Sequence, residues 1–308
     1  MNIIFMGTSE FAVKSLEKLY NNGYNISLVI TQPDRPKGRG KAFSFSPIKE
    51  CALNLGLEIY QPFNVNSEES VEKIRKLKPD FLIVIAYGQI LKKSLLGIAK
   101  LETINIHASL LPKYRGAAPI NWAILNGENK TGITSMKMTE GLDSGPIILQ
   151  KEIPILDTDD SISLTNKLSE LGAEVLLETL NRIIIGNIVY VEQDNSKSTY
   201  APIITKEDGK IDWNWDVKKI KNHIRAFKPW PGSYFYYDNL IVKVNEVDIL
   251  FSDHNEKIGT IIKADDSGIW VAAKNGFVII KEIQFPGKKM VKVSDFLRGN
   301  NIEIGKLV

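Results

Sequence analysis

The first part of the chain alternates short apolar runs with amphipathic stretches. The apolar runs are rich in β-branched and aromatic residues and lie at residues 3–6, 26–31, 58–61, 81–87 and 104–109. Between them, residues 9–20, 47–55 and 68–77 carry apolar side chains at helical spacing. This alternation predicts an α/β fold, with a doubly wound and mostly parallel sheet that helices cover on both faces. Residues 81–86 are apolar at every position, as expected for a central strand.

Further along the chain the pattern changes. Residues 131–138 and 147–155 predict a hairpin-like pair of strands, and residues 161–184 predict a long helix capped by Asp160 or Ser161. The periodicity fades over residues 187–204. Residues 216–227 then predict a helix, and short strands at 241–247, 259–263, 269–273 and 278–283 predict a small β-barrel. We therefore expect one domain over residues 1–188, a linker over 189–204 and a second domain over 205–308.

Composition adds limits to this prediction. The chain has 308 residues, of which 44% are hydrophobic and 24% are charged, as in ordinary soluble proteins. Its single cysteine, Cys51, cannot form an intramolecular disulfide and has no second thiol to help it bind a metal. The N-terminal apolar run is too short for a signal peptide, and no run reaches the length of a membrane span. These features predict a cytoplasmic protein.

The candidate chemistry lies at the end of one predicted strand, residues 103–109. Asn105 and His107 are two positions apart, so their side chains point to the same face. Asp143 follows on a loop between Gly141 and Gly145. An amide can donate to an oxyanion, an imidazole can carry protons near neutral pH, and a carboxylate can orient the ring. Together these groups suit transfer of an acyl group to an amine without a covalent enzyme intermediate.

A second interpretation of Asn105 and His107 is a hydrogen-bonded structural pair, which is the commoner role of such a pattern on an apolar strand. The surroundings favour a functional role, because an imidazole between β-branched residues on a central strand is costly without a partner. His107 is one of only three histidines in the chain.

Several motifs resemble those of the formyltransferases that use 10-formyltetrahydrofolate. They are Asn105-x-His107, the Ser-Leu-Leu-Pro-x-x-Arg-Gly segment at residues 109–116, and Gly141-x-Asp143-x-Gly145. Two further segments, at residues 31–41 and 224–231, resemble the members of this family that act on initiator methionyl-tRNA. The similarity runs from about residue 3 to about residue 291.

The resemblance implies a Rossmann-like formyltransferase fold, a C-terminal OB-fold-like barrel that binds tRNA, and a monomer. It also implies transfer of the formyl group of 10-formyltetrahydrofolate to the α-amino group of methionine on initiator methionyl-tRNA, with no metal. Asn105 and His107 would stabilise the oxyanion, while Asp143 would support His107 and help to pass the proton. The implied folate pocket comprises Ser109, Leu110, Leu111 and Pro112, with Tyr87, Gly88, Gln89, Ile90 and Leu91 covering the pterin.

A basic segment at residues 33–47 is the second informative feature. Its cations are Arg35, Lys37, Arg39 and Lys41, and its glycines and prolines predict a loop without regular structure. Charge alone is typical of a solvated surface loop, whereas the resemblance implies an insertion that reaches the acceptor arm of the tRNA. The net charge of +3 falls after residue 204, where Lys288 and Lys289 are a candidate RNA-binding patch.

Two other functions stay open at this point. A related formyltransferase acting on an amino sugar or a ribonucleotide amine would share the three candidate catalytic residues but would not need the basic insertion or the second domain. A non-catalytic RNA-binding protein on the same scaffold would not need Asn105, His107 and Asp143. The presence of all these features favours the tRNA-directed activity.

Overall fold

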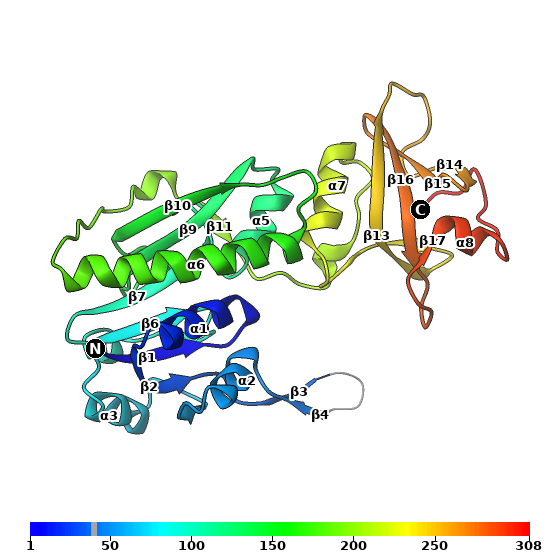
Figure 1. The fold of residues 1–308 in the computed structure, drawn as a ribbon. Coiled ribbons are helices and arrows are strands. Elements are labelled where there is room, and N and C mark those ends of the chain that lie inside the picture. The colour runs from blue at the N-terminus through cyan, green and yellow to red at the C-terminus, as the bar shows by residue number, and fades with distance from the viewer. Residues whose placement is uncertain (38–41) are drawn as a thin grey trace. The chain divides into compact units, whose positions relative to one another are not determined.

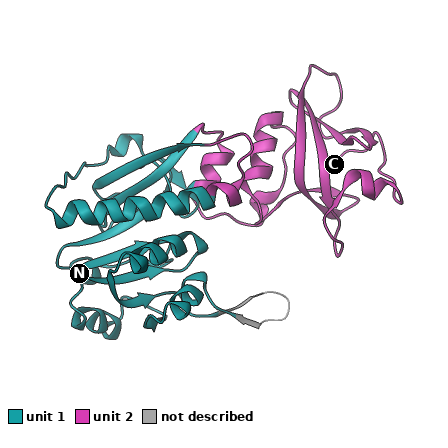
Figure 2. Ribbon diagram, in the orientation of Figure 1, with its two compact units in different colours: residues 1–119, 130–154, 165–201 teal, residues 120–129, 155–164, 202–308 magenta. Residues whose placement is uncertain are grey.

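The computed structural model describes the backbone of residues 1–37 and 42–308, with the side chains of all of these except residues 35–37, 42 and 43. Figure 1 shows the chain as a ribbon. The described residues form two compact units, coloured separately in Figure 2. Unit 1 comprises residues 1–119, 130–154 and 165–201, and unit 2 comprises residues 120–129, 155–164 and 202–308.

Unit 1 is built on a seven-stranded mixed sheet with the strand order β10-β9-β7-β6-β1-β2-β5. Five strands are parallel: β1 (Asn2–Gly7), β2 (Asn25–Ile30), β5 (Ile59–Tyr60), β6 (Phe81–Ile85) and β7 (Glu102–His107). The antiparallel pair β9 (Lys130–Lys137) and β10 (Ile147–Pro154) extends the sheet beside β7. All five residues of β6 are buried at the middle of the sheet. The predictions of an α/β sheet, of a central strand at residues 81–86 and of the hairpin are therefore confirmed.

Helices pack on the sheet through alternate strand positions. Ile4 and Met6 of β1 share one core cluster with Val71 and Ile74 of α3. On β7, Ile106 approaches α6 at Gly172, where a Cβ atom would lie 3.4 Å from the Ile106 side chain. The helical elements of this part of the chain are η1 (Glu10–Ala12), α1 (Val13–Asn21), α2 (Pro47–Asn54), α3 (Glu68–Lys76), α4 (Lys93–Leu96), α5 (Pro119–Leu125) and α6 (Ser161–Ile184).

The helix starts follow their sequence signals. Ser46 accepts a hydrogen bond from the N–H of Lys49 at the start of α2, and Ser67 caps α3 in the same way. At α6, the Asp160 carboxylate accepts hydrogen bonds from the N–H groups of Ile162 and Ser163. Asp160, rather than Ser161, is thus the capping residue.

The basic segment contains regular structure on both sides of residues 38–41. Arg35–Lys37 form β3 and Ala42–Ser44 form β4, and the two strands pair antiparallel. The prediction that Gly and Pro keep residues 33–47 out of regular structure is wrong for these six residues. A two-stranded ribbon leaves half of its main-chain groups without a ladder partner, so Pro36 is tolerated there as it is on an edge strand.

Unit 2 is built on a six-stranded antiparallel sheet. Its path runs β12 (Ser233–Tyr237), β13 (Leu240–Phe251), β16 (Gly276–Gln284), β15 (Gly268–Ala273) and β14 (Ile261–Asp265), with β17 (Val291–Lys292) also paired to β16. Helices α7 (Val217–Ala226) and α8 (Val293–Leu297) flank this sheet, and Val217, Ile220 and Val293 enter its core. The sequence predicts a small β-barrel after the α/β domain, and the β domain found here, with its strands antiparallel, agrees with that prediction.

Residues 224–231 are the second of the two segments that resemble family members acting on methionyl-tRNA. In the structure this segment has a structural role in unit 2. The Arg225 guanidinium donates hydrogen bonds to the main-chain oxygens of Leu156 and Asp159, at 2.8 and 2.7 Å. Asn121 donates to the main-chain oxygen of Ala226 at 2.6 Å. These contacts explain why residues 120–129 and 155–164 belong to unit 2 although they come from the earlier part of the chain.

Candidate active site

The carboxyl ends of the parallel strands meet at one edge of the unit 1 sheet. Thr8 follows β1 and donates a hydrogen bond to the main-chain oxygen of Tyr87, which follows β6, at 2.7 Å. Gln32, after β2, reaches the same oxygen at 3.3 Å. Asn105 and His107 lie in the last half of the neighbouring strand β7. Ligands of open α/β sheets bind beyond this edge, and the structure places the candidate residues there.

Asp143 lies on the loop between β9 and β10, in a backbone conformation that few residues adopt. Its φ is +46°, within the left-handed region that aspartate tolerates better than most residues. At Gly145 a Cβ atom would lie 1.8 Å from the main-chain oxygen of Lys137, so no other residue fits without a shift of the loop. The loop therefore packs closely on the end of β9.

The structure brings Asn105, His107 and Asp143 together. Asn105 Nδ2 donates to Asp143 Oδ1 at 3.4 Å, and His107 Nδ1 lies 3.7 Å from Asp143 Oδ2. The main-chain N–H of Gly116 donates to Asp143 Oδ2 at 2.8 Å. The side chains of His107 and Asp143 are only 7% and 11% exposed, so their interaction is weakly screened by solvent.

The second ring nitrogen of His107 is held by the main chain. Nε2 lies 2.8 Å from the carbonyl oxygen of Tyr114. A carbonyl oxygen only accepts hydrogen bonds, so Nε2 carries a proton. Nδ1 is then the nitrogen that gains or loses a proton, and it faces the Asp143 carboxylate. The ring can accept a proton at Nδ1 and form an imidazolium that the carboxylate stabilises.

Most main-chain N–H and C=O groups of the candidate folate residues at 109–112 already form hydrogen bonds within the protein. Thr134 donates to the oxygen of Ser109 at 2.7 Å and accepts from the N–H of Leu111 at 3.1 Å. Gln150 donates to the oxygen of Leu111 at 2.8 Å, and Lys113 N–H donates to the oxygen of Leu110. A cis peptide bond joins Leu111 to Pro112. This segment can therefore shape a binding surface more readily than it can offer hydrogen bonds.

The candidate pterin residues at 87–91 divide into buried and exposed positions. Tyr87 and Leu91 are each 2% exposed and belong to the core of unit 1, whereas Ile90 is 74% exposed. Gln89 is fixed by a hydrogen bond from the N–H of Val65 to its side-chain oxygen, at 2.9 Å. Gly88 is exposed and has a φ of +90°. Gly88 and Ile90 are thus the most exposed members of this segment, and Gln89 is partly exposed.

The candidate RNA-binding residues lie in two places. Arg35 and Lys37 are the first and last residues of β3, while Arg39 and Lys41 lie outside the described residues. Lys288 and Lys289 are exposed in the turn between β16 and β17. The side chain of Asp34, the one acid among these cations, accepts hydrogen bonds from Lys49 and Gln61. These hydrogen bonds lower the pKa of Asp34 below its ordinary value.

Two polar residues at the site have roles that the sequence did not reveal. Gln193 donates through Nε2 to the main-chain oxygens of Asp143 and Gly145, at 2.9 and 2.7 Å. Arg115 donates through Nε and Nη2 to Gln193 Oε1, at 3.1 and 2.7 Å. Arg115 belongs to a motif that the sequence singled out, but Gln193 lies in the predicted linker, where no periodicity marked it.

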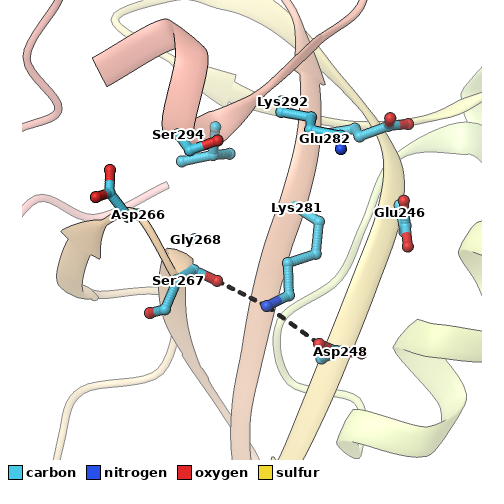
Figure 3. Close-up of a pocket in the computed structure, with 10 residues that line it drawn as sticks. Glu246, Asp248, Asp266, Ser267, Gly268, Lys281, Glu282, Lys292 and Ser294 are labelled. Carbon is cyan, nitrogen blue, oxygen red and sulfur yellow. Dashed lines mark hydrogen bonds and ion pairs between the residues drawn. The ribbon is translucent and has the colours of Figure 1, made fainter. Parts of the chain in front are cut away.

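A cavity of about 240 Å³ lies in unit 2, on the sheet beside α8. Figure 3 shows Lys281 in this cavity, where its Nζ contacts Asp248 and the main-chain oxygen of Ser267. The lining also holds the carboxylates of Glu246, Asp266 and Glu282. This excess of acids does not suit a phosphate group.

Two further features of the described residues bear on other functions. No three His, Cys, Asp or Glu side chains in this part of the chain gather in a way that could hold a metal ion. None of the described helices combines the length and apolar character needed to cross a membrane.

Comparison with known proteins decides the family. Residues 1–180 match the formyl transferase family, and residues 203–301 match the formyl transferase C-terminal domain. A methionyl-tRNA formyltransferase from Clostridium novyi is 47% identical over 305 residues, covering 99% of this chain and 98% of the relative. The chain belongs to the methionyl-tRNA formyltransferase family. The resemblance predicted from the motifs is thereby confirmed.

Other relatives agree with this placement. The methionyl-tRNA formyltransferase of Clostridium tetani is 48% identical over 306 residues, covering 99% of this chain and 98% of the relative. Among solved structures, an N-formyltransferase from Helicobacter canadensis in complex with folinic acid and dTDP-3-aminofucose has a TM-score of 0.67. It is 23% identical and covers 90% of this chain and 97% of its own, so this likeness shows the fold alone.

Proposed function

We propose that this chain transfers the formyl group of 10-formyltetrahydrofolate to the α-amino group of methionine on initiator methionyl-tRNA. The observation that carries the proposal is the convergence of Asn105, His107 and Asp143 at the carboxyl edge of the sheet. This occurs in a chain that is similar to methionyl-tRNA formyltransferases over 99% of its length. We place the reaction in the cytoplasm and expect a monomer.

Asn105 stabilises the charge that develops during transfer. As the amine attacks the formyl carbon, negative charge collects on the formyl oxygen. The Asn105 amide has two N–H donors, and one of them points to Asp143. The second is free to donate to the formyl oxygen without any change in the charge of the enzyme.

His107 and Asp143 handle the proton that the attacking amine must lose. Because Nε2 is fixed on the Tyr114 carbonyl, proton transfer involves Nδ1. The distance of 3.7 Å between Nδ1 and Asp143 Oδ2 exceeds an ordinary hydrogen bond. A water molecule or the amine itself can bridge the two groups from the side, within hydrogen-bond distance of both, and the Asp143 carboxylate stabilises the imidazolium that forms. The same groups return a proton to the departing nitrogen.

The exposed residues beside this site can accommodate a bound folate. The exposed side chain of Ile90 and the exposed Gly88 lie after β6, which is the neighbour of β7 in the sheet. Leu110 and Pro112 are partly exposed on the segment that follows β7. These residues can supply an apolar surface and main-chain contacts for a flat ring, while the bound folate supplies the formyl group.

The basic segment at residues 33–47 is the proposed tRNA contact of unit 1. Asp34 is occupied by Lys49 and Gln61, so it does not neutralise the cations that follow it in the sequence. Alternating cations in a segment can contact successive phosphates of a nucleic acid, and such contacts dominate affinity for nucleic acids. Lys288 and Lys289 offer a second, smaller set of exposed cations on unit 2.

A comparison of acceptors tests this function. The purified chain is incubated with 10-formyltetrahydrofolate and, separately, with initiator methionyl-tRNA, elongator methionyl-tRNA and a nucleotide-linked amino sugar. We expect rapid formylation of initiator methionyl-tRNA and little reaction of the other two. Preferred formylation of the amino sugar would assign the chain to a different acceptor, and no formylation in the presence of tRNA binding would indicate a non-catalytic RNA-binding protein.

A further inference from the structure

The carboxylate of Asp143 is placed by a loop that a buried polar network holds from behind. Gln193 lies at the centre of this network and is 9% exposed. Its amide nitrogen donates to the main-chain oxygens of Asp143 and Gly145, and its amide oxygen accepts two hydrogen bonds from Arg115. All four polar contacts of the Gln193 side chain are therefore used within unit 1.

Arg115 fixes the orientation of the Gln193 amide. Its guanidinium cannot accept a hydrogen bond, so the oxygen of Gln193 must face Arg115 and the nitrogen must face the loop. Arg115 is 4% exposed, and its Nη2 also donates to the side-chain oxygen of Asn195 at 2.8 Å. A buried cation that donates three hydrogen bonds does not rotate freely, so the direction of the amide is set.

The same network holds both the main chain of Asp143 and the Gly116 N–H group that binds its carboxylate. Arg115 and Gly116 form the short strand β8 (Arg115–Gly116), and the N–H of Gly116 donates to Asp143 Oδ2. β8 pairs with β11 (Tyr200–Ala201), which follows Gln193 in the chain. The backbone of Asp143 and its carboxylate are thus held by neighbouring parts of the same network.

We propose that Gln193 and Arg115 are positioning residues for the formyl transfer, acting through Asp143. The inference rests on the proposed function, because it assigns Asp143 its catalytic role. The left-handed backbone of Asp143 needs such support, since a residue other than glycine adopts this conformation only where its surroundings fix it. Without the two hydrogen bonds from Gln193, the carboxylate loses its fixed distance to His107.

The variant Gln193→Glu separates this role from general stability. A carboxylate keeps, and strengthens, the acceptor that Arg115 requires, but it offers no N–H to the oxygens of Asp143 and Gly145. We expect kcat to fall by roughly 10- to 100-fold, as displacement of a reacting group by about 1 Å can cause. KM values for the folate and the tRNA should change little, because Gln193 is 9% exposed and its polar groups are bonded within the protein.

Ser169→Ala is the matched control. Ser169 is 5% exposed and donates to the main-chain oxygen of Phe11 at 2.9 Å, so this variant also loses a buried hydrogen bond in unit 1. It should keep the kcat of the unaltered enzyme. Thermal unfolding of each variant gives the loss of stability against which the loss of kcat is compared.

A double-variant cycle shows whether Gln193 acts through Asp143. Once Asp143→Ala has removed the carboxylate, adding Gln193→Glu should lower kcat no further. A multiplicative loss in the double variant, or unaltered kcat in Gln193→Glu, would overturn the positioning role. Full activity of Asp143→Ala alone would instead overturn the proposed mechanism, and the positioning role with it.

Discussion

Replacing Asp143 by Asn tests the electrostatic part of the mechanism with the smallest change of shape. The amide can still accept the N–H of Gly116, now 2.8 Å from Asp143 Oδ2, but its other end is then an NH₂ group facing the NH₂ group of Asn105. It also lacks the negative charge that lies 3.7 Å from His107 Nδ1. The variant therefore cannot stabilise the imidazolium that forms when His107 takes up a proton.

The structure gives a magnitude for this loss. Two unit charges about 4 Å apart interact by about 4 kcal/mol at an effective dielectric constant of about 20. The two side chains are only 7% and 11% exposed, so we expect most of this energy, roughly 3 kcal/mol, to be lost from the transition state, which corresponds to about a hundredfold in rate. Binding of tRNA should be unaffected, because Asp143 lies outside both basic regions.

The measurement is single-turnover formylation of initiator methionyl-tRNA at saturating folate, with filter binding of the tRNA in parallel. His107→Gln is the companion variant, because it removes the titratable ring on the other side of the contact. Within the proposed mechanism, both variants should be slow and both should bind tRNA normally. A rate for Asp143→Asn within about threefold of the unaltered enzyme would show that the charge of Asp143 has no part in the reaction.

Three further predictions follow from other regions. Arg35→Ala and Arg39→Ala should each weaken tRNA binding and reduce the slope of log K against log salt by about one unit. The measurement is filter binding of the tRNA from low to physiological salt, and an unchanged slope would mean that these residues touch no phosphate. Gly145→Ala should lower the melting temperature and the rate together, because its Cβ would lie 1.8 Å from the Lys137 oxygen; normal melting would refute the steric argument. Burial lowers the pKa of His223 to about 4. Between about pH 6.5 and 4 the unfolded chain therefore binds one more proton than the folded chain, so the free energy of unfolding should fall as the pH falls through this range. His223→Gln should flatten that part of the profile in denaturant unfolding, and an unchanged profile would assign the acid sensitivity to another group.

The sequence predicts the sheet of unit 1 well because its signal is local. Each strand is a short apolar run between turn residues, and β6 is apolar on both faces because it lies in the middle of the sheet. Period-two alternation also predicts that Asn105 and His107 share a face. The approach of Asp143 to them was inferred only from flanking glycines and a resemblance, since nothing local sets the distance between β7 and the β9–β10 loop.

Other features depend on contacts between distant parts of the chain and had no local signal. Gln193 lies 50 residues from Asp143, in a segment whose residues find their partners on unit 1 rather than in a repeating pattern. The tautomer of His107 depends on the carbonyl of Tyr114, and a sequence does not show which main-chain oxygen a ring will meet. The β3–β4 pair was missed because proline and glycine in the segment suggested a loop, whereas a two-stranded ribbon accommodates proline.

The central claim is that His107, held by Tyr114 and facing Asp143, handles the proton of the attacking amine. Its most direct test is the single-turnover rate of the His107→Ala variant, measured with bound initiator methionyl-tRNA and saturating 10-formyltetrahydrofolate. We expect a rate at least about a hundredfold below that of the unaltered enzyme, with tRNA affinity retained. A folded His107→Ala variant that formylates bound methionyl-tRNA at the unaltered rate would contradict it.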